Sequence, residues 1–388
     1  MTQTETQTET QTDTATRTGP SERELLRSVL HDTHVALGAT FTGFAGWTMP
    51  VRYGGDLAEH HAVRRAAGLF DLSHMGEIHV EGPAAAAALD GALVGDLGAL
   101  APGRARYTML CAPDGGVLDD LVVYRLAAEH YLVVANASNR LLVAAELGER
   151  CAGDGVRITD RSADTALVAV QGPASAAIIE TATGAPVGDL RYYAARPATL
   201  AGHQVLLART GYTGEDGFEV YVGTMGAAAV WERLTAAGTG HGLVPCGLAC
   251  RDTLRLEAGM PLHGHELGPG RSPFASGLGR VVKFGKEADF VGRAALARER
   301  DTPQARVPAG LRGSGRRAPR AGHPVLDGAG ATVGEVTSGV LSPTLGHPIA
   351  MAFVDRAVSG PGTALVVDVR GRPEPVEVVG LPFYTRPE

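Results

Sequence analysis

Cysteine is scarce in this chain. Only four of its 388 residues are cysteines, at Cys111, Cys151, Cys246 and Cys250. They are too few and too scattered for a disulfide framework, and the three residues between Cys246 and Cys250 differ from the two-residue spacing of redox and zinc motifs. We therefore expect reduced, unpaired thiols.

The sequence also lacks long apolar runs and an excess of positive charge. No stretch approaches the ~18 apolar residues that cross a bilayer, and the N-terminus has no charged segment followed by an apolar one, as a secretory signal would. Lys and Arg number 35 against 42 Asp and Glu, a net charge of −7, so no general positive field attracts nucleic acid or an anionic membrane. These absences predict a cytoplasmic protein with neither partner.

What is present is the composition of an ordinary globular protein, with 44% hydrophobic and 20% charged residues. At about 150 residues per domain, the length predicts two or three domains. Thr occupies every even position from Thr2 to Thr18 without an apolar face, which predicts a disordered tail over residues 1–21. Ordered chain is expected from about Glu22–Leu30, where leucines and a valine recur at helical spacing.

The order of the predicted elements indicates an α+β protein. From Gly76 onward, short strands and helices follow one another without regular βα alternation, which disfavours Rossmann and TIM architectures. Ser138 or Asn139 is expected to cap a helix over Leu141–Leu147. A three-strand meander is expected over Arg106–Cys111, Val117–Arg125 and Tyr131–Ala135.

The texture changes after about Lys283. Short strands separated by Gly and Pro predict a small antiparallel β-barrel or sandwich, which we assign to residues 299–388, after a larger region at 22–298. A flexible basic segment within it is expected to be a solvated loop or a docking patch for an acidic partner. Its arginines are Arg312, Arg316, Arg317 and Arg320.

Two adjacent aspartates lie in the strand that follows the Gly115-Gly116 turn. Asp119 and Asp120 point to opposite faces of that strand, and the neighbours on each face are apolar. A carboxylate among apolar side chains is costly without a hydrogen-bonding partner or a ligand, so one of the two is a candidate acid in a pocket. Capping of the turn by the pair is equally consistent with the spacing.

Glycine recurs every third residue at Gly211, Gly214 and Gly217. This spacing indicates a loop whose backbone can approach a flat ligand, with Tyr212 as a stacking ring. Glu219 follows in a strand and could accept hydrogen bonds from an amino-pyrimidine edge. A tight hairpin with solvated acids fits the same residues.

A helix is predicted from Cys246 to Gly259. Arg251 and Arg255 share a face of it, and Asp252 lies beside Arg255. A surface network of ion pairs and a guanidinium that binds a carboxylate in a cavity both remain open. The histidine pairs His60-His61 and His263-Gly-His265 diverge in direction, so no metal site is expected.

Eight runs of residues occur in order along the chain, and together they resemble the T-protein of the glycine cleavage system, an aminomethyltransferase. The resemblance covers about Leu30 to Phe383. The runs are Phe44–Tyr53, Gly68–Met75, Gly115–Leu121, Gln171–Pro173, Gly211–Glu215, Cys246–Met260, Asp289–Leu296 and Thr337–Gly346.

This resemblance implies two α+β folate-binding domains and a C-terminal antiparallel β-barrel around a central cavity. It implies that the methylene of aminomethyl-dihydrolipoyl-lysine on a lipoylated H-protein passes to tetrahydrofolate, which releases ammonia and gives 5,10-methylenetetrahydrofolate. Glycine decarboxylase and dihydrolipoamide dehydrogenase are the implied partners in the same pathway. No metal or redox cofactor is required.

The resemblance also assigns residues. It implies a catalytic role for Asp120, so that Asp119→Asn should affect turnover far less, and pterin binding by Glu219. The chain departs from the family at Cys250, where a small alanine is usual, and at His263, where an aromatic residue is common. The remaining implied ligand contacts are Met75, Tyr107, Asn136, Tyr212, Arg251 and, at the C-terminus, Tyr384.

Three related interpretations compete with this one. A sarcosine or dimethylglycine oxidase would need a flavin domain, for which the chain has no room and no glycine-rich strand-turn-helix. A folate-dependent demethylase of the same superfamily fits the Asp119-Asp120 and Arg251 runs less well. A non-catalytic folate-binding helper in iron–sulfur assembly would carry a cysteine where this chain has Gly277–Lys286.

Overall fold

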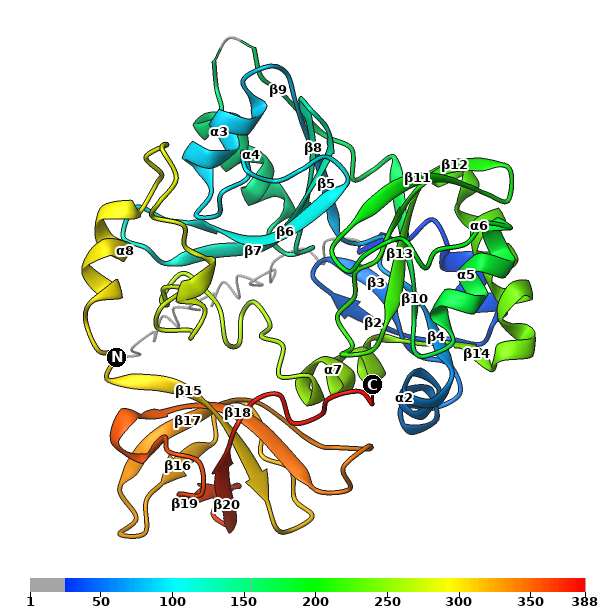
Figure 1. Ribbon diagram of the computed structural model, residues 1–388. Helices are drawn as coiled ribbons and strands as arrows, with labels where there is room; N and C mark the ends of the chain where they lie inside the picture. Colours follow the sequence, from blue (N-terminus) through cyan, green and yellow to red (C-terminus); the bar gives the residue numbers. More distant parts are fainter. Residues whose placement is uncertain (1–24, 154, 388) are drawn as a thin grey trace, which may run out of the picture.

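The structure is a computed structural model that describes residues 25–153 and 155–387. The predicted Thr-rich tail lies outside these residues. Two large sheets with their helices, a small three-stranded sheet and one barrel are grouped around the middle of the molecule (Figure 1). Within the described residues no helix has both the length and the apolar character that a membrane span requires.

The first large sheet contains the predicted meander, which is confirmed. Two helices, α3 (Ala85–Ala92) and α4 (Arg140–Arg150), cover its outer face with an apolar core that includes Leu121 and Val123. In spatial order its five strands are β6 (Arg104–Cys111), β7 (Val117–Ala127), β8 (His130–Ala135), β5 (Gly76–Glu81) and β9 (Arg157–Asp160).

The second large sheet is covered in the same way by α5 (Ser175–Thr183) and α6 (Ala227–Gly238). All its strand pairs are antiparallel except the last. In spatial order its six strands are β11 (Ala195–Leu200), β12 (His203–Ala208), β13 (Gly217–Gly223), β10 (Thr165–Gln171), β4 (Ala67–Asp71) and β14 (Leu243–Pro245).

The inner faces of the two sheets meet in a shared apolar layer. Phe70 and Leu167 of the second sheet and Tyr124 and Leu132 of the first belong to one buried cluster. Each sheet is therefore covered on both faces, so a polar residue on either face of β7 is shielded from bulk water. Around this pair lie β1 (Leu26–Arg27), α1 (His31–Ala36), β2 (Thr40–Phe44), β3 (Trp47–Arg52), α2 (Asp56–Arg65) and α7 (Leu248–Glu257).

The C-terminal strands close into the predicted antiparallel barrel, below the sheets in Figure 1. The boundary at residue 298 stays a prediction. The barrel order is β15 (Arg306–Gly313), β18 (Pro348–Asp355), β17 (Thr332–Leu341), β16 (Pro324–Leu326), β19 (Ala364–Asp368) and β20 (Pro373–Val379). The remaining elements are α8 (Arg293–Arg300) and the 3-10 turns η1 (Thr224–Gly226), η2 (Thr239–His241), η3 (Gly279–Val281) and η4 (Arg356–Val358).

Glu257, at the end of α7, joins the barrel to the sheets. One of its carboxylate oxygens accepts hydrogen bonds from the Ser342 hydroxyl at 2.5 Å and the Thr344 amide at 3.0 Å, both in the β17–β18 connection. The other oxygen lies 2.8 Å from Nη2 of Arg64 and 3.2 Å from Nε2 of His60, both on α2. Although burial raises the pKa of Glu257, these partners lower it to about 2. Glu257 is therefore an ionised, buried carboxylate whose two oxygens are both paired, with the barrel and with α2.

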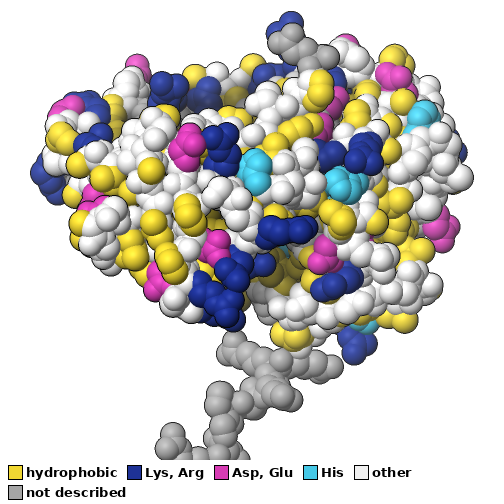
Figure 2. Space-filling model, turned by 90° about the horizontal axis from the view of Figure 1, so that it is seen from below, with side chains coloured by type: hydrophobic (Ala, Val, Ile, Leu, Met, Phe, Trp, Pro, Cys, Tyr) yellow, Lys and Arg dark blue, Asp and Glu magenta, His cyan; other side chains and the backbone are white. Residues whose placement is uncertain are grey.

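Two local expectations differ from the structure. The helical spacing near Leu26 is wrong, because Leu26–Arg27 pair with β3 as a short strand and the leucine is half exposed. The basic segment is partly neutralised: Arg312 pairs with Glu377 at 2.9 Å and Arg317 with Glu374 at 2.6 Å. On the face of the molecule seen in Figure 2, acidic side chains lie beside several of the Lys and Arg side chains.

Candidate active site

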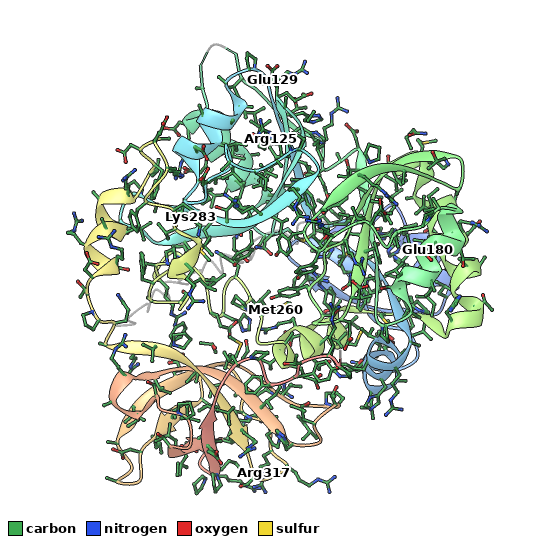
Figure 3. All side chains as sticks on the ribbon, in the orientation of Figure 1. Arg125, Glu129, Glu180, Met260, Lys283 and Arg317 are labelled. Atoms are coloured by element: carbon green, nitrogen blue, oxygen red, sulfur yellow. The ribbon has the colours of Figure 1, made fainter. Side chains whose placement is uncertain are left out.

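A cavity of about 570 Å³ lies where the inner faces of the two sheets meet α7 and the loop after it. The loop carries Met260, which faces the middle of the molecule (Figure 3). Seven of the eight residues implied by the resemblance line this cavity, and they come from separate parts of the chain. They are Met75, Tyr107, Asp120, Asn136, Tyr212, Glu219 and Arg251.

Asp120 is presented to the cavity from β7 by two hydrogen-bond donors. Tyr107 donates its hydroxyl to Oδ2 at 3.0 Å, and the Asn136 side-chain amide donates to Oδ1 at 2.9 Å. Burial raises the pKa of Asp120, while the hydrogen bonds from these two groups oppose the rise. Burial also raises the pKa of Tyr107 far above its ordinary value, so Tyr107 stays a neutral donor. The carboxylate is thus fixed in direction and poorly hydrated.

Asp119 points the other way, as strand alternation requires, and is fully buried. Its Oδ1 accepts from the side-chain amides of Asn136 at 2.9 Å and Asn139 at 2.6 Å, and its Oδ2 accepts from the Asn136 backbone at 3.0 Å. Burial raises the pKa of Asp119 to about 7, against these three donors. Asp119 therefore fixes Asn136 and Asn139 in position from the face of β7 that does not line the cavity. Asn139 occupies the N-cap position of α4, one of the two positions predicted, but its side chain makes no capping hydrogen bond and donates its amide to Asp119 instead.

Glu219 projects from β13 with one oxygen held by hydroxyl groups. Oε2 lies 2.5 Å from the hydroxyl of Thr210, 3.3 Å from that of Tyr124 and 3.4 Å from that of Tyr221. Burial raises the pKa of both tyrosines well above the ordinary value, so they are neutral donors. With Oε2 fixed in this way, Oε1 is available to a ligand in the cavity.

Arg251 lies on α7 over the ring of Tyr212, with 4.9 Å between its guanidinium carbon and the ring centroid. No ion pair of its guanidinium is found within residues 25–153 and 155–387, and burial lowers its pKa despite the nearby Glu219. Of the two interpretations of this helix face, ion pairing applies to Arg255, which pairs with Asp252 at 2.8 Å. Arg251 is thus a half-buried cation at the cavity that can receive an anionic or carbonyl group.

The glycines of the loop at residues 211–217 are required for a reason other than the expected approach of a flat ligand. A Cβ at Gly211 or Gly217 would lie 2.1 or 2.2 Å from the Gln171 side chain. Gln171 donates to the Thr210 carbonyl at 3.1 Å and accepts from the Thr213 hydroxyl at 2.9 Å. These two glycines make room for an internal glutamine that shapes the loop, and Tyr212 is the residue of this loop that brings a ring to the cavity.

Tyr384 is not brought to the cavity wall with the others. Its backbone N–H donates to the Glu257 carbonyl at 2.8 Å, and its ring lies under the guanidinium of Arg64, 4.1 Å from the centroid. Arg64 in turn donates to the Thr213 carbonyl at 2.7 Å, in the loop that carries Tyr212. Its place is therefore behind the cavity, and a substrate contact by Tyr384 stays a prediction.

Three histidines, His74, His263 and His265, line the cavity and were not expected as site residues. His74 precedes Met75, and burial lowers its pKa to about 4, so it is neutral. His263 belongs to a histidine pair that the sequence offered only as a weak metal pattern. The sequence alone could not distinguish these histidines from histidines of the core. Their position at the cavity depends on how α7 and the loop after it pack against the first sheet.

One cluster has metal-ligand chemistry, formed by Glu59, Cys246 and Cys250. The Glu59 carboxylate already accepts four backbone N–H groups, from Tyr53, Gly54, Gly55 and Gly247, at 2.6–3.2 Å. These bonds give the cluster a structural role in connecting α2 to α7. All four cysteines are buried and free, as expected.

Comparison with known proteins gives the same picture over nearly the whole chain. A family model described as the GCVT N-terminal domain matches residues 30–286, and one described as the glycine cleavage T-protein C-terminal barrel domain matches residues 306–385.

Individual relatives are similar at high identity. An aminomethyltransferase of Saccharopolyspora erythraea is 59% identical over 357 residues, covering 92% of this chain and 97% of the relative. One of Streptomyces coelicolor is 58% identical over 370 residues, covering 94% and 99%. The crystal structure of glycine cleavage system aminomethyltransferase T from Bartonella henselae superposes with a TM-score of 0.87 at 37% identity, covering 93% of this chain and 99% of that one.

Proposed function

The chain belongs to the glycine cleavage T-protein family of aminomethyltransferases, and on that premise we propose that its cavity binds tetrahydrofolate with the reacting nitrogens beside Asp120. The reaction converts aminomethyl-dihydrolipoyl-lysine and tetrahydrofolate into 5,10-methylenetetrahydrofolate, ammonia and dihydrolipoyl-lysine. Two N–H protons leave the folate: one completes ammonia and the other reaches the sulfur. The observation that carries the proposal is that Asp120, Glu219 and Arg251 face one cavity.

Glu219 sets the direction in which the pterin enters. Its free oxygen accepts from the amino-pyrimidine edge, whose neighbouring N–H groups match a carboxylate acceptor. Arg251, which lacks an anionic partner of its own in the described residues, receives an acceptor group of the same ligand. Tyr212 and Met75 contact the flat faces of the ring system. A volume of about 570 Å³ is in the range of sites for ligands of this size.

Asp120 then acts where charge develops. As a folate nitrogen attacks the electrophilic methylene, the nitrogen becomes positive, and a fixed carboxylate stabilises that charge without having to reorganise. Tyr107 and Asn136 hold both oxygens in place, which contributes orientation as well as charge. Asp120 can accept the proton that the nitrogen then releases.

The donor is a lipoylated H-protein, whose arm must reach the cavity. Glycine decarboxylase and dihydrolipoamide dehydrogenase act on the same arm before and after this step. The basic segment that carries Arg317 lies at the end of the barrel away from Met260 (Figure 3), so docking elsewhere than on this segment is favoured. A cytoplasmic location stays a prediction.

The proposal is tested by turnover of aminomethylated H-protein with tetrahydrofolate, following ammonia and methylene-folate together. Glu219→Gln should weaken tetrahydrofolate binding by about tenfold to a hundredfold, because it exchanges an ionised acceptor for a neutral amide. Glu129→Gln, an exposed turn residue at the top of Figure 3, is the matched control and should behave like the unaltered chain. Absence of turnover in the unaltered chain, or unchanged folate affinity in Glu219→Gln, would contradict the proposal.

A further inference from the structure

Asp119 holds two cavity residues through two asparagines. Asn136 donates its side-chain amide both to Asp119 Oδ1 and to Asp120 Oδ1, each at 2.9 Å. Asn139 donates its amide to the same Asp119 oxygen at 2.6 Å and lies 3.1 Å from Nδ1 of His263. One buried carboxylate thus fixes both an acid and a histidine of the cavity wall.

The contact with Asn139 determines where the proton of His263 lies. Because Asp119 accepts only from N–H groups, the amide nitrogen of Asn139, and not its oxygen, must face both Asp119 and His263. Nδ1 of His263 is therefore an acceptor, and the ring proton is on Nε2. Nε2 is buried and has no hydrogen-bond partner in the described part of the chain, although His263 lines the cavity. A buried N–H without a partner is suited to a ligand that supplies the acceptor.

Given the proposed function, we propose that the Nε2–H of His263 donates a hydrogen bond to the sulfur of the dihydrolipoyl arm as the carbon–sulfur bond breaks. In this step the methylene carbon keeps its bond to the folate nitrogen, and the electron pair of the carbon–sulfur bond goes to sulfur. His263 stabilises the resulting thiolate and gives up no proton of its own. The thiolate is later protonated by the second proton that leaves the folate.

The chemistry of the two departing groups selects the sulfur. An amine leaves only when it is protonated, which requires an acid, and a neutral imidazole whose Nδ1 already accepts from Asn139 is a donor but a very weak acid. A thiolate is a stable anion, since a free thiol ionises with a pKa of about 8.5, and it needs only a donor. Asp120 faces the nitrogen that becomes positive, and His263 faces the atom that becomes negative. The pair matches the charges that form at the two ends of the transferred carbon.

Three substitutions of His263 in the full chain distinguish the effect of the N–H donor from the effect of the side chain's shape. His263→Phe keeps a flat ring without a donor, and His263→Gln can place an N–H near the Nε2 position. His263→Asn reaches only the Nδ1 position and serves as the matched amide control. The expected result is that Phe and Asn lower kcat by about ten- to a hundredfold, with KM for tetrahydrofolate within about twofold, whereas Gln restores most of the rate. In single turnover of His263→Phe, free thiol should appear later than ammonia.

Several outcomes would overturn the proposal while leaving the proposed function intact. Full activity of His263→Phe would do so, as would a Gln variant that is folded yet as slow as Phe. A raised dissociation constant for tetrahydrofolate with unchanged kcat would show that His263 contacts the folate instead. Thiol and ammonia appearing together in the Phe variant would remove the sulfur as the acceptor. Failure of the proposed function itself is distinct, because the unaltered chain would then not turn over.

Discussion

The adjacent aspartates of β7 offer the sharpest test of the site, because one strand presents two carboxylates to two different environments. In Asp120→Asn the new amide can accept from Asn136 with its oxygen and donate to the Tyr107 hydroxyl with its nitrogen, so both contacts survive. Folding stability should change by about 1 kcal/mol or less. The negative charge at the reacting nitrogens is lost, and turnover should fall at least ~10²-fold, about 2.7 kcal/mol of transition-state stabilisation.

Asp119→Asn should have the opposite profile. Three N–H groups point at its two oxygens, and an asparagine can present only one oxygen to them. Whichever way the new amide turns, its own N–H₂ meets at least one buried donor. Each unpaired buried group costs about 1–3 kcal/mol, so we expect a loss of roughly 2–5 kcal/mol in the free energy of unfolding. The expectation from the sequence, that Asp119→Asn affects turnover far less than Asp120→Asn does, stays a prediction.

Urea denaturation and steady-state turnover, measured on both variants and on the unaltered chain, check this pair. Tetrahydrofolate affinity of Asp120→Asn should stay within about tenfold, which keeps a loss of binding from being mistaken for a loss of catalysis. If Asp120→Asn retains turnover within about twofold, the electrostatic role is refuted. If Asp119→Asn unfolds at the same urea concentration as the unaltered chain, the three hydrogen bonds to Asp119 do not stabilise the fold.

Two further predictions concern pH. Tyr107→Phe removes the hydroxyl that favours the ionised form of Asp120, so the pKa of Asp120 should rise further. The acid limb of the kcat–pH profile should then move to higher pH, which rate measurements across the acid range would detect. The pKa of Glu257 is about 2 in the folded protein against an ordinary value of 4.5. Its contribution of about 3 kcal/mol to the free energy of unfolding is therefore present above pH 4.5 and is lost as pH falls toward 2. Glu257→Gln should be less stable at pH 7 and lose less stability on acidification, as followed by urea midpoints at each pH.

Much of the fold follows from local pattern. The meander over β6, β7 and β8 and the short strands of the barrel were predictable because alternation and turn residues act over a few positions. The faces of Asp119 and Asp120 were also predictable, since the strand period is two. The spacing could not say which of the two faces is open to a ligand. That depends on α7 and the second sheet, which are distant in sequence.

The errors have the same origin. The leucines near Leu26 have helical spacing, but pairing with β3 at Trp47 and Thr48 determines their conformation. Gly211 and Gly217 look like a ligand loop, yet the nearby side chain is that of Gln171, some forty residues away along the chain. His263 lines the cavity because the loop after α7 packs against the first sheet, where Asn139 lies 3.1 Å from its Nδ1. In each case a tertiary contact decides between interpretations that local sequence leaves equal.

The bonds of Glu257 bear on the exchange of barrels between related proteins. In a chimera that joins a foreign barrel after α8, the graft must provide the equivalents of Ser342 and Thr344, while the recipient provides His60 and Arg64. The Thr344 hydroxyl also donates to Glu257, at 2.7 Å, so a graft lacking this hydroxyl or that of Ser342 would leave a fully buried carboxylate short of donors where the barrel meets the sheets. Compatibility between halves is then governed by this handful of residues rather than by overall identity, and they are the positions to transplant together.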